Sequence, residues 1–189
     1  VTANELYLPL GRPVHLVLEG PDVIHSFWVP QLGGKRDLVP GRINHLSLTP
    51  EAVGEYLGQC AEFCGVSHAN MGMRVIVVPP EEFDRWVAAQ RAPAAEPGGP
   101  AAEGKAVYTA LACVGCHTIK GVSAGVLGPD LTHFGSRRTV AGGLLPNTPD
   151  TLAAWIRDPQ SVKPGAKMPS LGLSAAQARA VAAYLLSLK

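Results

Sequence analysis

The sequence lacks several features that would place it in other classes of protein. Its apolar runs, such as 75–78 and 181–186, are far shorter than the roughly 18 residues of a membrane-spanning helix. The formal net charge is only +1, which argues against a nucleic-acid-binding protein. The chain begins at Val1 with neither an initiator methionine nor a charged and then apolar leader. We therefore expect a soluble chain that is a processed product or a fragment.

Charged residues are also few, at 16%, but 47% of the residues are hydrophobic, so the chain can bury a core and is not expected to be disordered. One segment, 91–104, has no large apolar side chain, and 11 of its 14 residues are Ala, Pro or Gly. We interpret 91–103 as a linker between domains at 1–90 and 104–189. The first domain carries a net charge of −4 (six basic and ten acidic residues) and the second a net charge of +5 (ten basic and five acidic, counting from residue 91). Opposite charges predict mutual attraction of the two halves.

The first half has the patterning of β-strands. Apolar and polar residues alternate over 14–18 and again over 44–48, while 75–78 is a continuous β-branched run. Glycine- and proline-containing turns separate these segments, which favours a β-sandwich or Greek-key barrel. The stretch 81–89 is predicted to be a short helix that closes the domain.

The second half is predicted to be all-α. Helical composition extends over 104–111, and Thr148 followed by Pro149 predicts a helix that ends before Pro159. Ser174 and Gln177 form a predicted capping box for the last helix. The long loops between these helices need something around which to organise.

The last two cysteines indicate what these long loops surround. Cys113, Cys116 and His117 form a C-x-x-C-H motif, which is the pattern for covalent attachment of a c-type haem. A soft sixth ligand suits electron transfer, and Met168 is the one methionine in this half. His133 is the rival ligand. A pair of disulfides among the four cysteines would leave the motif spacing without an explanation.

The other two cysteines lie in the segment GQCAEFCGVSHANM at 58–71. Cys60, Cys64, His68 and Met71 supply two thiolates, an imidazole and a thioether within twelve residues, which is typical of a soft-metal site. A structural zinc would leave Met71 without a role, and a disulfide would leave His68 without one as well. The ligand set therefore favours copper over zinc. His15 and His45 lie outside this motif, and we interpret them as ordinary structural or surface histidines.

Both halves resemble known families. The C-terminal half resembles small class I cytochromes c, including the segment GPDL at 128–131, where the proline carbonyl of that family orients the haem histidine. The N-terminal half resembles the CuA domain of cytochrome c oxidase subunit II, a cupredoxin-like barrel. This resemblance rests on DVIHSFWVP at 22–30, on Lys35, on PGR at 40–42 and on the cysteine segment. Together they resemble subunit II of a caa-type oxidase.

The resemblance implies a set of ligands. Cys60 and Cys64 would bridge two coppers, and His25 and His68 would each cap one of them. Met71 and the backbone carbonyl of Glu62 would be weak outer ligands. The Glu62 carboxylate would also reach a magnesium ion at the boundary with subunit I.

The resemblance further implies an electron-transfer subunit with no oxygen-reducing site or catalytic residues of its own. Electrons would pass from a donor, another cytochrome or a quinol-oxidising complex, to haem c, then to CuA and to subunit I, where oxygen reduction is coupled to proton pumping. The expected location is the periplasmic face of a bacterial plasma membrane, with an N-terminal hairpin anchoring the parent protein. Two alternatives stay open: an electron-entry module of a nitric oxide or nitrous oxide reductase, and a redox sensor without an enzyme partner.

Overall fold

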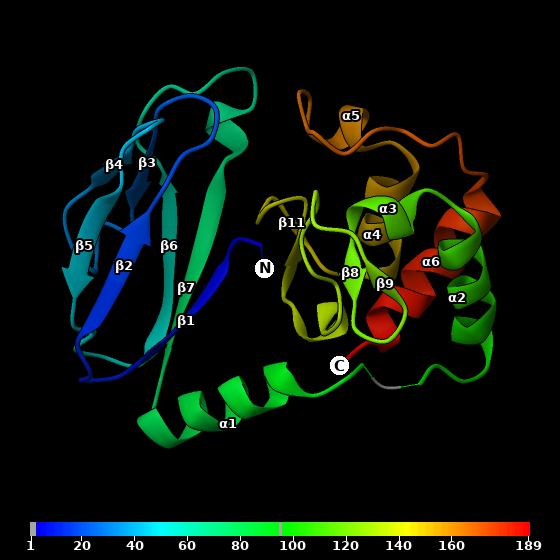
Figure 1. Ribbon diagram of the computed structural model, residues 1–189, viewed down its shortest axis with the longest axis horizontal. Helices are drawn as coiled ribbons and strands as arrows, with labels where there is room; N and C mark the ends of the chain where they lie inside the picture. Colours follow the sequence, from blue (N-terminus) through cyan, green and yellow to red (C-terminus); the bar gives the residue numbers. More distant parts are fainter. Residues whose placement is uncertain (1–2, 95) are drawn as a thin grey trace. The chain divides into compact units, whose positions relative to one another are not determined.

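The structure, a computed structural model, describes residues 3–94 and 96–189 (Figure 1). Internal contacts divide these residues into two compact units, Asn4–Arg91 and Ala92–Lys189. Helix α1 (Pro80–Arg91) ends at the boundary between these units, and helix α2 (Pro100–Ala110) begins within 91–103, the segment expected to be a linker. Residues 1, 2 and 95, which the predicted first domain and linker include, lie outside the described residues. Within the described ranges, no helix is long and apolar enough to cross a membrane.

The first unit is a sandwich of a five-stranded sheet and a two-stranded ladder (Figure 1). The larger sheet has the order β1-β7-β6-β3-β4, with β1 and β7 parallel and the other pairs antiparallel. The smaller ladder pairs β2 with β5. The bounds of the strands are β1 Glu5–Pro9, β2 Val14–Leu18, β3 His25–Trp28, β4 Arg36–Leu38, β5 Asn44–Leu48, β6 Gly54–Cys60 and β7 Gly72–Val78.

Strand patterning explains how these layers pack. Leu8, Val29, Val75 and Val77 form the buried centre, and Val14 of the two-stranded ladder packs against it. The run 75–78 is buried throughout, whereas β2 and β5 alternate between partly buried and exposed side chains. The two-sheet β architecture expected from the alternation is thus confirmed.

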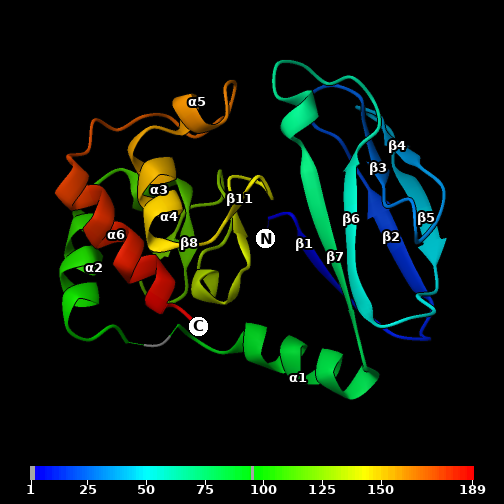
Figure 2. The same ribbon diagram turned by 180° about the vertical axis from the view of Figure 1, so that it is seen from behind.

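The second unit is helical, with α2 packed along the last helix, α6 (Figure 2). Tyr108 and Tyr184 meet edge to face in its core at a centroid distance of 5.6 Å. The unit consists of α2, α3 (Cys113–Cys116), α4 (Pro149–Arg157), α5 (Pro159–Val162) and α6 (Ala175–Ser187), with a 3₁₀ turn at Phe134–Ser136. The unit was expected to be all-α, but its long loops also contain two short ladders, β8 (Thr118–Ile119) with β9 (Ser123–Ala124), and β10 (Thr139–Val140) with β11 (Leu145–Pro146).

Local capping explains where the helices begin. The Thr148 hydroxyl accepts a hydrogen bond from the backbone N–H of Thr151, and Pro149 occupies the first helical position, where its missing N–H costs nothing. Ser174 and Gln177 form the predicted reciprocal capping box at the start of α6. Both helix starts expected from the sequence are confirmed.

Candidate metal and haem sites

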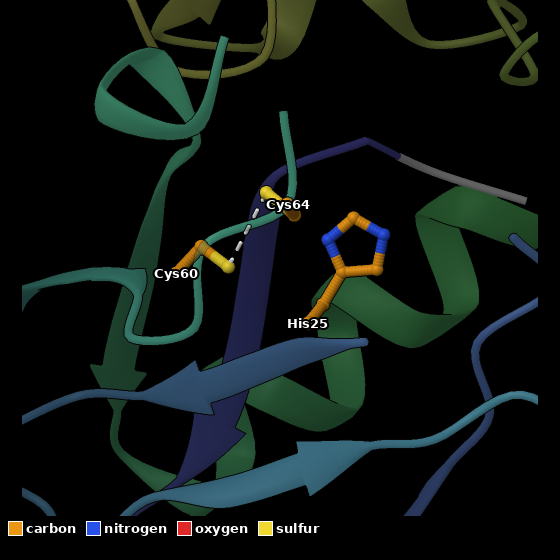
Figure 3. Close-up of side chains that lie close together, drawn as sticks. All are labelled: His25, Cys60 and Cys64. Atoms are coloured by element: carbon orange, nitrogen blue, oxygen red, sulfur yellow. Dashed lines mark hydrogen bonds between the residues drawn. The ribbon is translucent and has the colours of Figure 1, made fainter. Parts of the chain in front are cut away.

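The first candidate site lies where the end of β6 meets the start of β3. Cys60 is the last residue of β6, and His25 is the first residue of β3, which pairs with β6 through Phe27 and Cys60. A loop then carries Cys64 back beneath the strand ends and leads into the 3₁₀ turn that begins at His68. Figure 3 shows the His25 ring turned toward the two sulfurs.

The side chains of the predicted ligands lie close together in one cluster. The Sγ atoms of Cys60 and Cys64 are 3.7 Å apart, and each lies within 4.8 Å of a ring nitrogen of His25. The Cys64 Sγ is also 3.6 Å from the Nδ1 of His68 and 3.8 Å from the Sδ of Met71. The structure therefore gathers five sulfur and nitrogen donors, and this soft donor set fits copper.

His25 is held with one ring nitrogen turned into the cluster. Its Nε2 is hydrogen-bonded at 2.9 Å to the Oδ1 of Asp22, three residues earlier. Its Nδ1 is buried and has no hydrogen-bond partner within residues 3–94 and 96–189. An unsatisfied buried nitrogen is costly, so a ligand at this atom is the natural explanation. Burial lowers the pKa of His25, but its interactions with Asp22 and Cys60 outweigh that effect and raise it.

The Cys60 thiol is poised to ionise. Burial raises its pKa, but contacts with the backbone of Glu62 and Ser26 lower it. The two histidines of the cluster lower it further, and the net result is a pKa of about 7. Since the thiolate is the form that binds metals, the environment prepares Cys60 to be a ligand.

The backbone carbonyl of Glu62 faces the cysteine cluster, whereas its side-chain carboxylate faces the surface. Its backbone carbonyl lies 3.1 Å from the Cys60 Sγ, on the side of the sulfurs. Its carboxylate points outward, with the side chain 43% exposed, and lies 3.7 Å from the Lys35 Nζ. Phe63 and Val66 on the same loop are exposed to 77% and 82%. The loop therefore presents one carboxylate and two apolar side chains to solvent.

The second candidate site is the C-x-x-C-H motif. Cys113 and Cys116 begin and end the single turn of α3, and both are free thiols. His117 follows directly, and its Nδ1 is 2.8 Å from the carbonyl oxygen of Pro129. Because that contact occupies Nδ1, the other ring nitrogen is the one left for iron, which fits a covalently held haem.

Gly128 makes this histidine contact possible. A Cβ at this position would lie 2.5 Å from Cε1 of the His117 ring, closer than real side chains approach. The Gly128 N–H also donates a 2.7 Å hydrogen bond to the Cys116 carbonyl, which ties the two segments together. Only a residue without a side chain fits between backbone and ring.

The two candidate sixth ligands differ in their surroundings. Met168 lies half-buried in the irregular segment between α5 and α6, and its carbonyl accepts a hydrogen bond from the Gln160 side chain. His133 is buried, and its Nε2 is 3.1 Å from the Ala92 carbonyl. That contact commits one nitrogen of His133 to the backbone. The Met168 sulfur stays the predicted ligand.

Several residues that contact the proposed ligands had no role predicted from the sequence. Asp22 had no predicted role beyond its place in the segment 22–30. An acidic residue three positions before a ligand histidine could have indicated a partner for the ring of His25. Ser26 is buried beneath the cysteines and donates a 2.8 Å hydrogen bond to Asp37. Ser123 donates a 2.8 Å hydrogen bond to the His117 carbonyl, and no local pattern pointed to it.

Comparison with known proteins gives a match for each half of the chain. Residues 1–78 match the family model of the cytochrome c oxidase subunit II periplasmic domain, and residues 101–189 match that of cytochrome c. Cytochrome c oxidase subunit 2 of Alkalihalophilus pseudofirmus is 44% identical, with 98% of this chain and 54% of the relative covered. That of Bacillus sp. strain PS3 is 37% identical, with 100% and 56% covered.

Solved structures give a likeness over a smaller part of the chain. The periplasmic domain of subunit II of cytochrome oxidase (CoxB) of Bradyrhizobium japonicum is 38% identical, with a TM-score of 0.44. That match covers 46% of this chain and 62% of the other. The chain spans about half the length of the curated relatives.

Fold and motifs together define a cupredoxin-like copper domain followed by a cytochrome c domain. Its domains are those of the cytochrome c oxidase subunit II periplasmic domain and of cytochrome c, and the relatives that match nearly its whole length are named cytochrome c oxidase subunit 2.

Proposed function

We propose that this chain is the electron-entry part of a respiratory haem-copper oxidase. It would take electrons from a donor cytochrome or quinol-oxidising complex at a haem c site and relay them through a CuA site to subunit I. There, oxygen reduction would be coupled to proton pumping. The observation that carries this proposal is the cluster of His25, Cys60 and Cys64, with ligand atoms within 4.8 Å of one another.

At the copper site we propose the ligand arrangement that the family implies. The copper would be held by the cysteine thiolates and the histidine imidazoles, with a thioether and a backbone carbonyl as weak ligands: Cys60, Cys64, His25, His68, Met71 and Glu62. When bound, the copper pair and the haem iron each change oxidation state by one electron. The chain keeps the ligands fixed during that change, because the cysteine loop is anchored at Cys60 by a 2.9 Å hydrogen bond to the Met71 carbonyl.

At the haem site the proposed thioether links are at Cys113 and Cys116 and the proposed axial ligands are His117 and Met168. The Pro129 carbonyl orients the histidine ring through the 2.8 Å contact with Nδ1. Burial raises the pKa of the Cys113 thiol, which favours its protonated form.

We further propose that the exposed loop of the copper domain faces subunit I. Phe63 and Val66 supply apolar contact area there, and the outward Glu62 carboxylate is placed to bind magnesium at that boundary. The location would be the periplasmic face of the membrane, with the anchor contributed by parts of the protein outside this sequence.

The direct test is metal content together with a visible and near-infrared spectrum of the copper-loaded chain. About two coppers per haem iron, with mixed-valence thiolate bands, would support the proposal. Cys60→Ser should abolish those bands, whereas Met73→Leu, a matched change at a methionine that packs in the core, should retain them. Haem with zinc, or with a disulfide at the cysteine pair, would instead favour a tethered cytochrome or a redox sensor.

A further inference from the structure

The outer face of the β2–β5 ladder brings together two histidines that the copper site does not use. His15 on β2 lies directly opposite Ser47 on β5, and His45 lies two residues before Ser47 on β5, opposite Val17. Both histidines are exposed, as are Val17 and Ser47 on the same face. Diagonal neighbours on a ladder are within reach of ring side chains.

The rings of His15 and His45 do come into contact across the ladder. The Nε2 of His15 is 3.0 Å from the Nδ1 of His45, and the two rings stack at a centroid distance of 5.0 Å. Two imidazole nitrogens from separate strands therefore lie next to one another at the protein surface.

The distance between these two nitrogens matches the distance between two adjacent ligand atoms on one metal ion. Nitrogens bound at about 2.0–2.1 Å are about 2.9 Å apart at a right angle and about 3.3 Å apart at the tetrahedral angle. The observed 3.0 Å is close to the right-angle value. Right-angled nitrogen and oxygen coordination is the preference of Cu²⁺ and Ni²⁺, whereas Zn²⁺ prefers the tetrahedron.

Ser47 supplies the outer contact that such a site needs. Its Oγ is 2.9 Å from the Nδ1 of His15. When that hydroxyl accepts the Nδ1 proton, the Nε2 of His15 keeps its lone pair and points it toward His45. Metal-bound histidines are commonly held in this way.

We propose that His15 and His45 form a surface site for one tetragonal divalent transition-metal ion, Cu²⁺ or Ni²⁺, with water in the remaining positions. The site belongs to the two-stranded ladder and shares no residue with the cysteine cluster. It therefore does not depend on the proposed function. In the metal-free protein a hydrogen bond links the same two nitrogens.

Calorimetric titration of Ni²⁺ into the full chain, with its haem attached and its cysteine site loaded with copper, tests the proposal. We expect one Ni²⁺ per chain. His15→Gln and His45→Gln should each weaken binding at least tenfold, and Ser47→Ala should weaken it by about tenfold. Val17→Ala, a matched change on the same exposed face, should leave the affinity within twofold of the parent. Added Cu²⁺ should give a tetragonal electron paramagnetic resonance signal with nitrogen coupling in the parent, in V17A and, at higher Cu²⁺ concentration, in S47A, but not in H15Q or H45Q.

Unchanged haem and copper spectra in every variant will show that the fold and the cysteine site are intact. Equal Ni²⁺ affinity in the parent, H15Q and H45Q would overturn the proposal. So would a parent that takes up no Ni²⁺ at millimolar concentration, because the two rings would then be only a hydrogen-bonded pair.

Discussion

The contact between Gly128 and His117 allows a sharp test of the haem site. In Gly128→Ala the new Cβ would lie 2.5 Å from Cε1, 2.7 Å from Nδ1 and 3.0 Å from Nε2 of the His117 ring. Ordinary contact begins at 3.4 Å, so the ring has to retreat by about 0.9 Å (3.4 − 2.5) or the backbone has to move. The backbone is held by the 2.7 Å hydrogen bond from Gly128 to Cys116.

The expected cost follows from the hydrogen bond that the ring loses. A retreat of that size stretches the 2.8 Å contact between Nδ1 and the Pro129 carbonyl beyond hydrogen-bonding distance. Loss of such an outer contact typically weakens a metal–histidine bond by about 10- to 100-fold. We therefore expect the haem-loaded variant to lose about 1.4–2.8 kcal/mol of unfolding free energy.

Guanidinium unfolding followed at the haem absorption band measures this loss. The haem itself should stay attached, since Cys113 and Cys116 are untouched, but part of it should become high-spin. The matched control is Gly115→Ala in the same motif, where a Cβ meets no described atom within 4 Å, and we expect a change within about 0.5 kcal/mol. If the two variants unfold alike and both stay low-spin, the inferred ring contact is not what positions His117.

Three further predictions concern other contacts. Gly104→Ala should destabilise the cytochrome unit by about 2 kcal/mol or more, because the added Cβ would overlap the Ala180 carbonyl of α6; an unchanged melting temperature would contradict this packing. Asp22→Asn removes the charged partner of His25 and should weaken copper binding by about tenfold in a chelator competition, whereas equal retention of copper would deny Asp22 a positioning role. Met168→Ala should keep covalent haem and lose the sulfur-to-iron absorption band, and persistence of that band would show that another residue is the sixth ligand.

Features with a local sequence signal were predictable. The alternation over 14–18 gave the strand β2 because side chains on a strand alternate with period two. The starts of α4 and α6 were predictable because a hydroxyl or amide within three residues caps the helix. The C-x-x-C-H motif and the cysteine loop are likewise local, so their ligands could be named from spacing and family resemblance.

Features that depend on strand register were not predictable. His15 and His45 are thirty residues apart, and only the pairing of His15 with Ser47 makes them neighbours. The start of α2 at Pro100 was not predictable either, because it lies among small residues that have no apolar periodicity of their own. Its helical state is fixed by packing against α6, which composition alone does not reveal.

In both candidate sites a hydrogen bond between one ring nitrogen and an oxygen atom orients the ligand histidine, but a different nitrogen makes this bond in each site. At the cysteine cluster, Asp22 occupies Nε2 of His25 and leaves Nδ1 facing the sulfurs; at the haem motif, the Pro129 carbonyl occupies Nδ1 of His117 and leaves Nε2. The tautomer of each ring is therefore set by the fold before any metal arrives. A ligand that is already oriented has little to rearrange when the metal gains or loses an electron, which is the property that a relay between two redox centres requires.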